Sequence, residues 1–302
     1  MRWADGEGAR AQLGTVGVWL GILSRTPWAA ARDAAARIEA AGYRALWINE
    51  GPAVKEPFAH AALLLGATER MAVATGIANV YARDAAAMRN GAYTLAEAYP
   101  GRFTLGLGVS HKPMVESRGH TYDKPLTTMR GYLDGLDAIE WAGPPPAPAP
   151  PLVLAALRPK MLALAAQRTA GAHPYFTPVA HTAKAREALG PDPLLAPELA
   201  VVLESDPARA RERARGYAGL YLKLPNYTNN LRDLGYGDED LAGGGSDRLI
   251  DAVIAWGDED AIARRVREHR EAGADHVCVQ PVGTDLDGTL SELERLAPAL
   301  VA

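Results

Sequence analysis

Several polar side chains that could carry chemistry stand directly after short apolar runs of this sequence. They are Asn49 and Glu50 after 45–48, Asn79 after 71–77, Ser110 and His111 after 103–109, and Gln280 after 276–279. A carboxyl group and an imidazole are common general acids and bases, and the imidazole titrates near neutral pH. The pattern predicts a site for proton transfer, provided that the apolar runs are strands whose ends meet.

The stretch 71–111 shows how the chain could bring such ends together. Its two apolar runs, 71–77 and 103–109, flank an alanine-rich segment that starts after Asp84, a residue that can cap a helix, and stops at Pro100 and Gly101. This is a strand–helix–strand unit, in which two buried strands run parallel. In α/β folds, ligands bind at the carboxyl ends of parallel strands, where the polar residues stand.

The same alternation extends over the whole chain. A glycine that ends a helix and precedes an apolar strand occurs at Gly42, Gly101, Gly171 and Gly273. Strands are predicted at 15–22, 45–48, 71–77, 103–109, 152–156, 172–176, 199–204 and 276–279. Strands that alternate with helices at this length favour a single (β/α)8 TIM barrel, with a doubly wound open sheet as the alternative.

Three segments depart from the alternation. Residues 1–12 are polar and predict a flexible extension before a single barrel domain at 13–302. The proline-rich stretch 143–151 reads as a domain linker or as a stiff loop, and we prefer the loop because a strand pattern resumes at Leu152. Residues 224–247 predict an insertion after the seventh strand, and 248–256 predicts a helix. Tyr227 and Tyr236 of the insertion either line a substrate cavity or pack the insertion itself, and we favour packing.

Composition excludes several classes of protein. The chain has 32 basic and 36 acidic residues, so its net charge of −4 gives no reason to expect nucleic acid or an anionic membrane as partner. The single cysteine, Cys278, fits a reducing compartment, and no apolar run resembles a signal peptide or a membrane span. The histidines lack metal-ligand spacing, so no metal site is predicted. We expect a cytoplasmic protein.

The strings TGIANVYARD, 75–84, and PGRFTLGLGVSH, 100–111, resemble the luciferase-like oxidoreductases. The resemblance extends over about 14–280 and is strongest to the actinobacterial branch of coenzyme F420-dependent oxidoreductases. It implies a luciferase-like (β/α)8 barrel, a deazaflavin cofactor, a small-molecule substrate and a homodimer. The implied reaction is hydride transfer between coenzyme F420 and that substrate. The alternatives are an FMN-dependent monooxygenase of the same superfamily and a non-catalytic flavin-binding relative.

The resemblance also implies cofactor-binding residues. A non-proline cis peptide at Gly76–Ile77 would support the middle ring, while Asn79 would bind the polar edge of the ring or be an ordinary turn residue. Asn49 and Ser110, which stand at the ends of the strands before and after that of Gly76, are also predicted to bind the cofactor. The turn AALRPKM, 155–161, matches the phosphate-binding turn of the family, at a helix start that suits an anion. Its predicted contacts are Ala156, Leu157, Arg158, Lys160 and Met161, and many relatives have glycine in place of Arg158.

Two residues are predicted to be catalytic. His111 matches a position that carries an acid/base or cofactor-contacting residue in relatives, some of which have glutamate there. Glu50 stands where relatives place a histidine, and Asn49 where they place an acidic residue, so the mechanism of the sugar-phosphate dehydrogenases does not carry over. A glutamate walled by Trp47 and apolar neighbours could act as an acid; the alternative is a solvated loop carboxylate.

Overall fold

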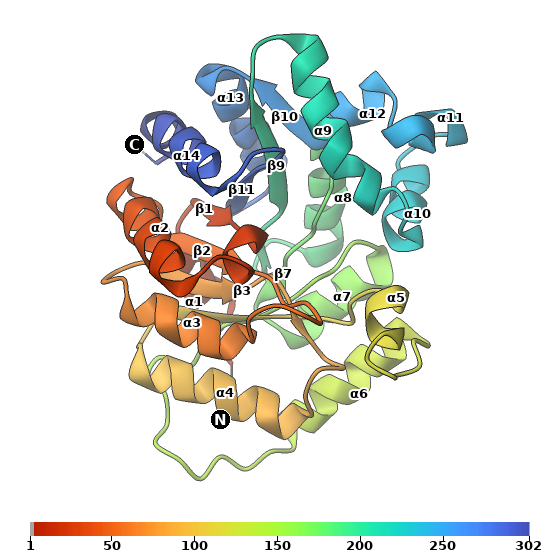
Figure 1. The fold of residues 1–302 in the computed structure, drawn as a ribbon. Helices are drawn as coiled ribbons and strands as arrows, with labels where there is room; N and C mark the ends of the chain where they lie inside the picture. The colour runs from red at the N-terminus through yellow and green to blue at the C-terminus, as the bar shows by residue number, and fades with distance from the viewer. Residues whose placement is uncertain (1–2, 302) are drawn as a thin grey trace.

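A curled parallel sheet forms the centre of the molecule, and helices surround it (Figure 1). The computed structural model describes residues 3–301. Its strands are β1 (Val16–Trp19), β2 (Ala45–Ile48), β3 (Ala72–Thr75), β4 (Ala78–Asn79), β5 (Phe103–Gly108), β6 (Leu152–Leu154), β7 (Gly171–Ala172), β8 (Leu194–Leu195), β9 (Glu198–Leu203), β10 (Ile254–Gly257) and β11 (Val277–Pro281). The order is β10-β9-β11-β1-β2-β3-β5-β6-β7-β8, with β4 paired to β5. The predicted TIM-barrel class is confirmed.

The ends of this curled sheet meet at residues 194–198. On one side, the N–H groups of Leu194, Ala196 and Glu198 donate to the segment 170–174; on the other, that of Cys278 donates to Pro197. The short link between β8 and β9 therefore pairs with β7 and with β11. The carboxyl ends of the barrel strands consequently meet around one mouth.

The helices and turns are α1 (Gly6–Leu13), η1 (Gly21–Ser24), α2 (Trp28–Ala40), α3 (Pro57–Gly66), α4 (Ala85–Ala98), α5 (Lys112–Glu116), α6 (Pro125–Asp137), α7 (Pro159–Arg168), α8 (Val179–Leu189), α9 (Pro207–Tyr221), α10 (Pro225–Asp233), α11 (Asp238–Leu241), η2 (Ala242–Gly244), α12 (Asp247–Val253), α13 (Glu259–Glu271) and α14 (Leu286–Leu300). Asp84 caps α4 as predicted, accepting from the N–H of Ala87 at 2.7 Å. No helix within residues 3–301 is long and apolar enough to cross a membrane.

The inside of the barrel is filled by small side chains around one large ring. Ala45, Ala72, Ala74 and Ala196 belong to a buried cluster that contains Trp47. Trp47 stacks on His173, with ring centroids 4.3 Å apart, and donates to His276 Nε2 at 3.1 Å. A Cβ at Gly17 would lie 2.7 Å from the His276 ring, so only glycine leaves room for that imidazole. The interior is therefore packed below the mouth.

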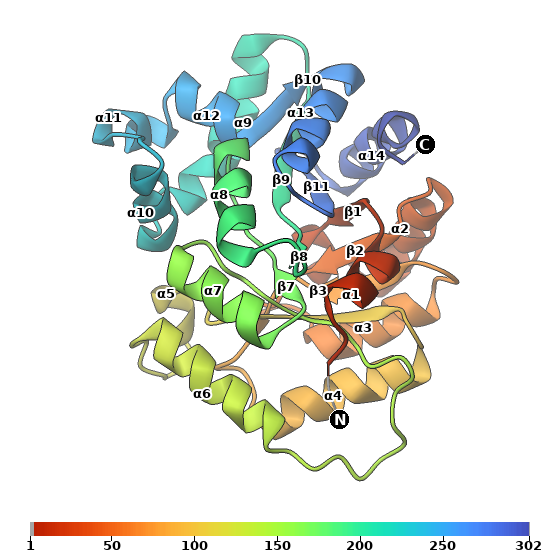
Figure 2. The same ribbon diagram turned by 180° about the vertical axis from the view of Figure 1, so that it is seen from behind.

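The predicted flexible extension at 1–12 is wrong for the residues that the structure describes. Asp5 caps α1 by accepting from the N–H of Gly8 at 2.9 Å, and Ala9 and Leu13 are fully buried in the barrel interior. Figure 2 shows α1 lying over the sheet, beside β3 and β8. The polar composition suggested a flexible segment because only one narrow face of this short helix is buried. Residues 1 and 2 lie outside the described part.

Two further predictions need correction. Residues 254–256, expected to end the helix 248–256, belong instead to β10, which pairs with β9 from Ala200 to Leu203. The run from Ala252 to Trp256 is apolar throughout, so its sequence gives no sign of where α12 stops. Gly171 does not follow a helix end directly but opens β7, and a Cβ there would collide with the backbone at Leu194.

The two irregular segments lie at different places. Residues 138–151 connect α6 to β6, and β6 pairs with β5 in the same sheet, so this stretch is a loop within one fold. The N–H of Ala4 donates to Pro150 O, which ties the loop to the chain start. The expected insertion at 224–247 contains α10, α11 and η2, which sit with α12 at one side of the barrel (Figure 1).

Candidate functional site at the mouth of the barrel

A ring of half-exposed residues follows the buried strands at one end of the barrel. Asn49, Gly76, Ser110, Tyr175 and Gln280 each stand where a run of buried residues ends. Each comes from a different part of the sheet, because parallel strands deliver their carboxyl ends to the same edge. The structure thus brings the predicted strand-end residues to one mouth.

The peptide bond between Gly76 and Ile77 is cis, as the resemblance implied. Trp19 Nε1 donates to the carbonyl oxygen of Gly76 at 3.2 Å, and a Cβ at Gly76 would collide with that nitrogen. A Cβ at Gly108 would lie 2.5 Å from the Ile77 side chain. Glycine at both positions therefore lets Trp19 and Ile77 approach the backbone at this end of β3 and β5.

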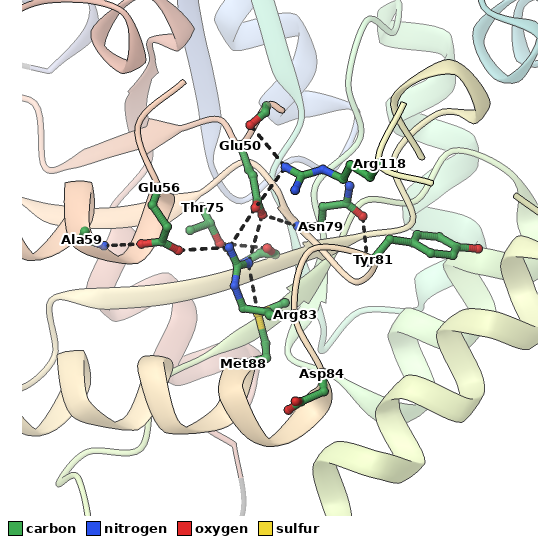
Figure 3. A network of polar contacts seen from close by, with 12 residues as sticks. Glu50, Glu56, Ala59, Thr75, Asn79, Tyr81, Arg83, Asp84, Met88 and Arg118 are labelled. Atoms are coloured by element: carbon green, nitrogen blue, oxygen red, sulfur yellow. Dashed lines mark hydrogen bonds and ion pairs between the residues drawn. The ribbon is translucent and has the colours of Figure 1, made fainter. Parts of the chain in front are cut away.

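Glu50 is the centre of a network of charged groups (Figure 3). Arg83 binds it with two nitrogens: Nη2 lies 2.8 Å from Oε1, and Nη1 lies 3.0 Å from Oε2. The N–H of Asn79 donates to Oε2 at 2.7 Å, and Arg118 Nη2 lies 3.7 Å from Oε1. The expected wall around Glu50 is thus polar, because Trp47 points into the barrel interior instead. Both carboxylate oxygens are engaged in holding the turn 79–83.

The Asn79 side chain is engaged within its own turn. Its Oδ1 accepts from the N–H of Tyr81 at 2.9 Å, and the residue is 4% exposed. This is the local backbone bond of an ordinary turn asparagine, the alternative that the sequence left open. The Nδ2 group has no such fixed partner and remains the part of Asn79 that a ligand could use.

His111 lies under the insertion rather than beside Glu50. Its imidazole hydrogen-bonds with Asn226, and its ring centroid lies 5.5 Å from that of Tyr227 in α10. Burial lowers the pKa of His111, and the bond to Asn226 opposes that shift. Within residues 3–301, no contact joins His111 to Glu50. The two predicted catalytic residues therefore occupy separate groups of contacts.

The predicted phosphate turn lies at the start of α7, a helix of ten residues. Arg158 is exposed, and its Nε lies 3.1 Å from Asp233 Oδ2 at the end of α10. The carbonyl oxygen of Leu157 accepts from His181 Nε2 at 2.7 Å, so that carbonyl faces away from any anion. Lys160 is exposed, Ala156 is buried and Met161 packs against the core. The turn offers two cationic side chains, one of which already pairs with a carboxylate.

A tyrosine-rich cluster at the mouth was missed by the sequence analysis, apart from its strand-end residue Gln280. The hydroxyl of Tyr175 donates to Gln280 Oε1 at 2.7 Å and lies within 3.0 Å of the hydroxyls of Tyr217 and Tyr221. Behind them stands Glu198, which is 1% exposed. A glutamate that opens the apolar run 198–203 was the one signal that could have indicated it.

Unpartnered buried atoms show where this mouth could hold a ligand. Asn49 Oδ1, His173 Nε2 and Thr177 Oγ1 are sealed from solvent without a hydrogen bond. His173 Nδ1 donates to Ala196 O at 2.7 Å, so Nε2 of the neutral ring carries a free lone pair. That Nε2 would lie 3.4 Å from a Cβ at Gly76. Buried polar atoms normally have partners, so these residues fit a polar ring system placed against Gly76.

Among the residues that the structure describes, no group of three or more His, Cys, Asp or Glu side chains could hold a metal ion.

Comparison with known proteins places the chain in a family. The family model described as luciferase-like monooxygenase matches residues 11–276. A 5,10-methylenetetrahydromethanopterin reductase from Methanolobus tindarius is 25% identical over 287 residues, which cover 81% of this chain and 88% of that protein. An uncharacterised protein of Mycobacterium tuberculosis is 33% identical over 112 residues, which cover 37% of this chain and 32% of that protein.

Solved structures share the fold at low sequence identity. An F420-dependent secondary alcohol dehydrogenase has a TM-score of 0.76 at 16% identity, covering 95% of this chain and 99% of that one. The coenzyme F420-dependent tetrahydromethanopterin reductase of Methanopyrus kandleri has 0.75 at 16% identity, with coverages of 95% and 98%. A type II Baeyer–Villiger monooxygenase of Pseudomonas putida in complex with FMN has 0.71 at 16% identity, also covering 95% and 98%.

Proposed function

Since the chain belongs to the luciferase-like monooxygenase family, we propose that it is an oxidoreductase that transfers a hydride between coenzyme F420 and a small organic substrate. The observation that carries this proposal is the unpartnered Nε2 of His173 beside Gly76, together with the unpartnered Oδ1 of Asn49 at a strand end of the barrel mouth. The relative from Methanolobus tindarius, a reductase aligned over most of both chains, supports it. When bound, coenzyme F420 would supply or accept the hydride.

The residues of the mouth fit a deazaflavin in three respects. Asn49 Oδ1 is a free acceptor for a ring N–H, and the backbone at Gly76 and Ile77 is half-exposed beneath the mouth. Ser110 stands at the neighbouring strand end with φ of 58°, a conformation that is uncommon outside glycine. The start of α7 would receive the phosphate, aided by Arg158 and Lys160.

The two predicted catalytic residues receive different roles. His111 would donate or accept the proton that accompanies hydride transfer, because its ring lies at a strand end and its lowered pKa keeps a neutral fraction available. Glu50 would act as a positioning residue, since its oxygens hold Arg83 and the N–H of Asn79. Its partners then keep the turn 79–83 in place beside the ring.

An FMN-dependent monooxygenase is the second candidate, because the structure from Pseudomonas putida holds FMN on the same fold. The tail of coenzyme F420 is longer and more anionic than that of FMN. The two cationic side chains at the start of α7 should therefore favour F420 by about 1–2 kcal/mol, the scale of one or two charge-assisted hydrogen bonds. This difference should shrink at high salt.

Absorbance titrations with coenzyme F420 and then with FMN test the proposal. We expect tighter binding of F420, and the double variant Arg158→Ala, Lys160→Ala should lose most of the difference. Asp233→Asn is the matched control, because it removes the carboxylate that pairs with Arg158 and should not weaken F420 binding. Equal or tighter binding of FMN by the unmodified chain would instead favour the monooxygenase.

A further inference from the structure

Glu198 is a carboxyl group buried without a cation. It opens β9 with 1% of its surface exposed, and its Oε2 accepts from the N–H of Phe176 at 3.0 Å. Its Oε1 lies 3.2 Å from the hydroxyl of Tyr217. Within residues 3–301, no lysine, arginine or histidine pairs with it. An ionised carboxylate in such a place is strongly unfavourable, and burial raises the pKa of Glu198 to about 8.

A chain of oxygen atoms leads from this carboxyl group to the mouth. The hydroxyl of Tyr217 lies 2.9 Å from that of Tyr175, which lies 2.7 Å from Gln280 Oε1. An amide oxygen only accepts, so Tyr175 donates to Gln280 and can itself accept from Tyr217 or from Tyr221, whose hydroxyl lies 3.0 Å away. When Tyr217 donates to Tyr175, its only proton is used, and its 3.2 Å contact with Glu198 is then a hydrogen bond in which a protonated Glu198 donates. A protonated Glu198 therefore completes the chain with every donor used.

The outer end of the chain orients the Gln280 amide. Because Oε1 is held by Tyr175, the Nε2 group is directed away from the tyrosines. It donates to no residue of the described chain, is not among the atoms sealed from solvent, and belongs to a half-exposed residue at the end of β11. Tyr175 also packs edge-on against Trp19, at 5.1 Å between ring centroids, and Trp19 binds the Gly76 carbonyl. The free amide N–H groups thus stand on the wall that holds Gly76.

We propose that Gln280 binds the carbonyl or hydroxyl oxygen of a neutral substrate, and that protonated Glu198 positions Gln280 through Tyr217 and Tyr175. This rests on the proposed function for the location of the cofactor and adds the class of substrate. The wall formed by these tyrosines, Trp19 and Gln280 is aromatic and uncharged. A carboxylate or phosphate group placed against it would find no cation, whereas a ketone, aldehyde or alcohol would find a hydrogen-bond donor and apolar surface.

The pH range in which this arrangement holds follows from the groups that face Glu198. They are the phenols of Tyr175, Tyr217, Tyr221 and Tyr227, the thiol of Cys278 and the imidazole of His173. Burial raises the pKa of each phenol and of the thiol and lowers that of His173 to about 4. Between about pH 6 and 9, Glu198 is thus the member of this cluster that titrates. Once Glu198 is ionised, Tyr217 turns to donate to it and Tyr175 loses that donor.

Binding of cyclohexanone, measured by isothermal titration calorimetry on the full chain, tests the proposal. Gln280→Ala should weaken binding about 10-fold or more, the effect of losing one hydrogen bond to an otherwise desolvated oxygen. Glu198→Gln should bind as the unmodified chain does at pH 7, because its amide donates to Tyr217 as the protonated acid does. Glu198→Ala should bind more weakly. From pH 7 to 9, the unmodified chain should lose affinity and Glu198→Gln should not.

Three results would overturn the inference: no binding of cyclohexanone by the unmodified chain, equal binding by Gln280→Ala, or loss of binding in Glu198→Gln at pH 7. Coenzyme F420 is titrated into the same proteins and should bind all of them alike. If the unmodified chain bound cyclohexanone through Gln280 but not F420, the proposed function would fail while the role of Gln280 stood. If F420 bound and Gln280→Ala had no effect on cyclohexanone binding, the role of Gln280 would fail while the proposed function stood.

Discussion

The residues at the mouth divide into those that hold structure and those left with free polar atoms. The Glu50 carboxylate accepts from Arg83 and from the N–H of Asn79. The side-chain oxygen of Asn79 accepts from the N–H of Tyr81. Asn49 Oδ1 and His173 Nε2 have no partner. Because a buried polar atom without a partner is unfavourable, free atoms of this kind point to a ligand more strongly than charge alone does. The charged residue of the pair 49–50 is therefore the structural one.

The roles given to His111 and Glu50 lead to different kinetic results. His111→Ala should reduce turnover about 10²–10⁴-fold, the contribution of a general acid or base, with little change in the affinity for F420. Glu50→Gln should reduce turnover and F420 affinity together, because the turn 79–83 loses its ion pair. Asn226→Ala removes the side chain that hydrogen-bonds His111 and Tyr227 but keeps the imidazole, and it serves as the milder variant. Steady-state kinetics would measure the turnover of each variant, and a titration with F420 would measure its affinity. Full turnover by His111→Ala would rule out a catalytic role for His111.

At the scale of single elements, two short helices cover the two ends of the barrel. α1 fills the end of the barrel opposite the mouth with Ala9 and Leu13. α10 covers part of the mouth, where it holds His111 through Asn226 and Arg158 through Asp233. One closes the packed interior, and the other brings side chains of a late segment to the strand ends.

The packing of α1 makes a stability prediction. Leu13→Ala should lower the free energy of unfolding by about 2–5 kcal/mol, as for other large-to-small changes in a core, because Leu13 is fully buried. Glu7→Ala, at an exposed position of the same helix, should cost about 0.5 kcal/mol. Urea denaturation of the two variants measures the difference. If both cost equally little, α1 would be the frayed extension that its composition suggested.

For the whole molecule, the interior of the barrel combines small residues with neutral imidazoles. His276 donates through Nδ1 to Gly14 O at 2.8 Å and accepts from Trp47 at Nε2. Such a ring must be neutral, because a protonated Nε2 could not accept. Burial lowers the pKa of His173 and His276 to about 4 and that of His269 to about 3. Protonation of these rings is therefore linked to unfolding of the barrel.

The linkage has a defined sign and pH window. A histidine whose pKa is lowered by folding contributes stability that is present above its ordinary pKa of 6.5 and lost as the pH falls toward about 4. Each such ring should contribute a slope of up to about 1.4 kcal/mol per pH unit in this window. Thermal unfolding between pH 7 and 4 tests this, and His276→Gln should reduce the slope. A midpoint that stays constant over this range would contradict the neutral interior.

The alternation of strands and helices is decided by the local sequence. Apolar runs of strand length, a capping residue such as Asp84 and a glycine such as Gly42 or Gly273 act within a few residues, so their effect can be recognised from the chain alone. The same is true of the polar strand ends at Asn49 and His111, which follow the buried runs. These signals predicted the barrel and the edge at which we propose its site.

What each side chain at that edge does was decided by the tertiary structure, because the deciding partners are distant in the chain. Glu50 is held by Arg83 and Arg118, and His111 lies under Asn226, more than one hundred residues later. Glu198 becomes a neutral carboxyl group only because β9 buries it without a cation. Burial and charge pairing depend on how the sheet curls, and no local pattern of residue types carries that information.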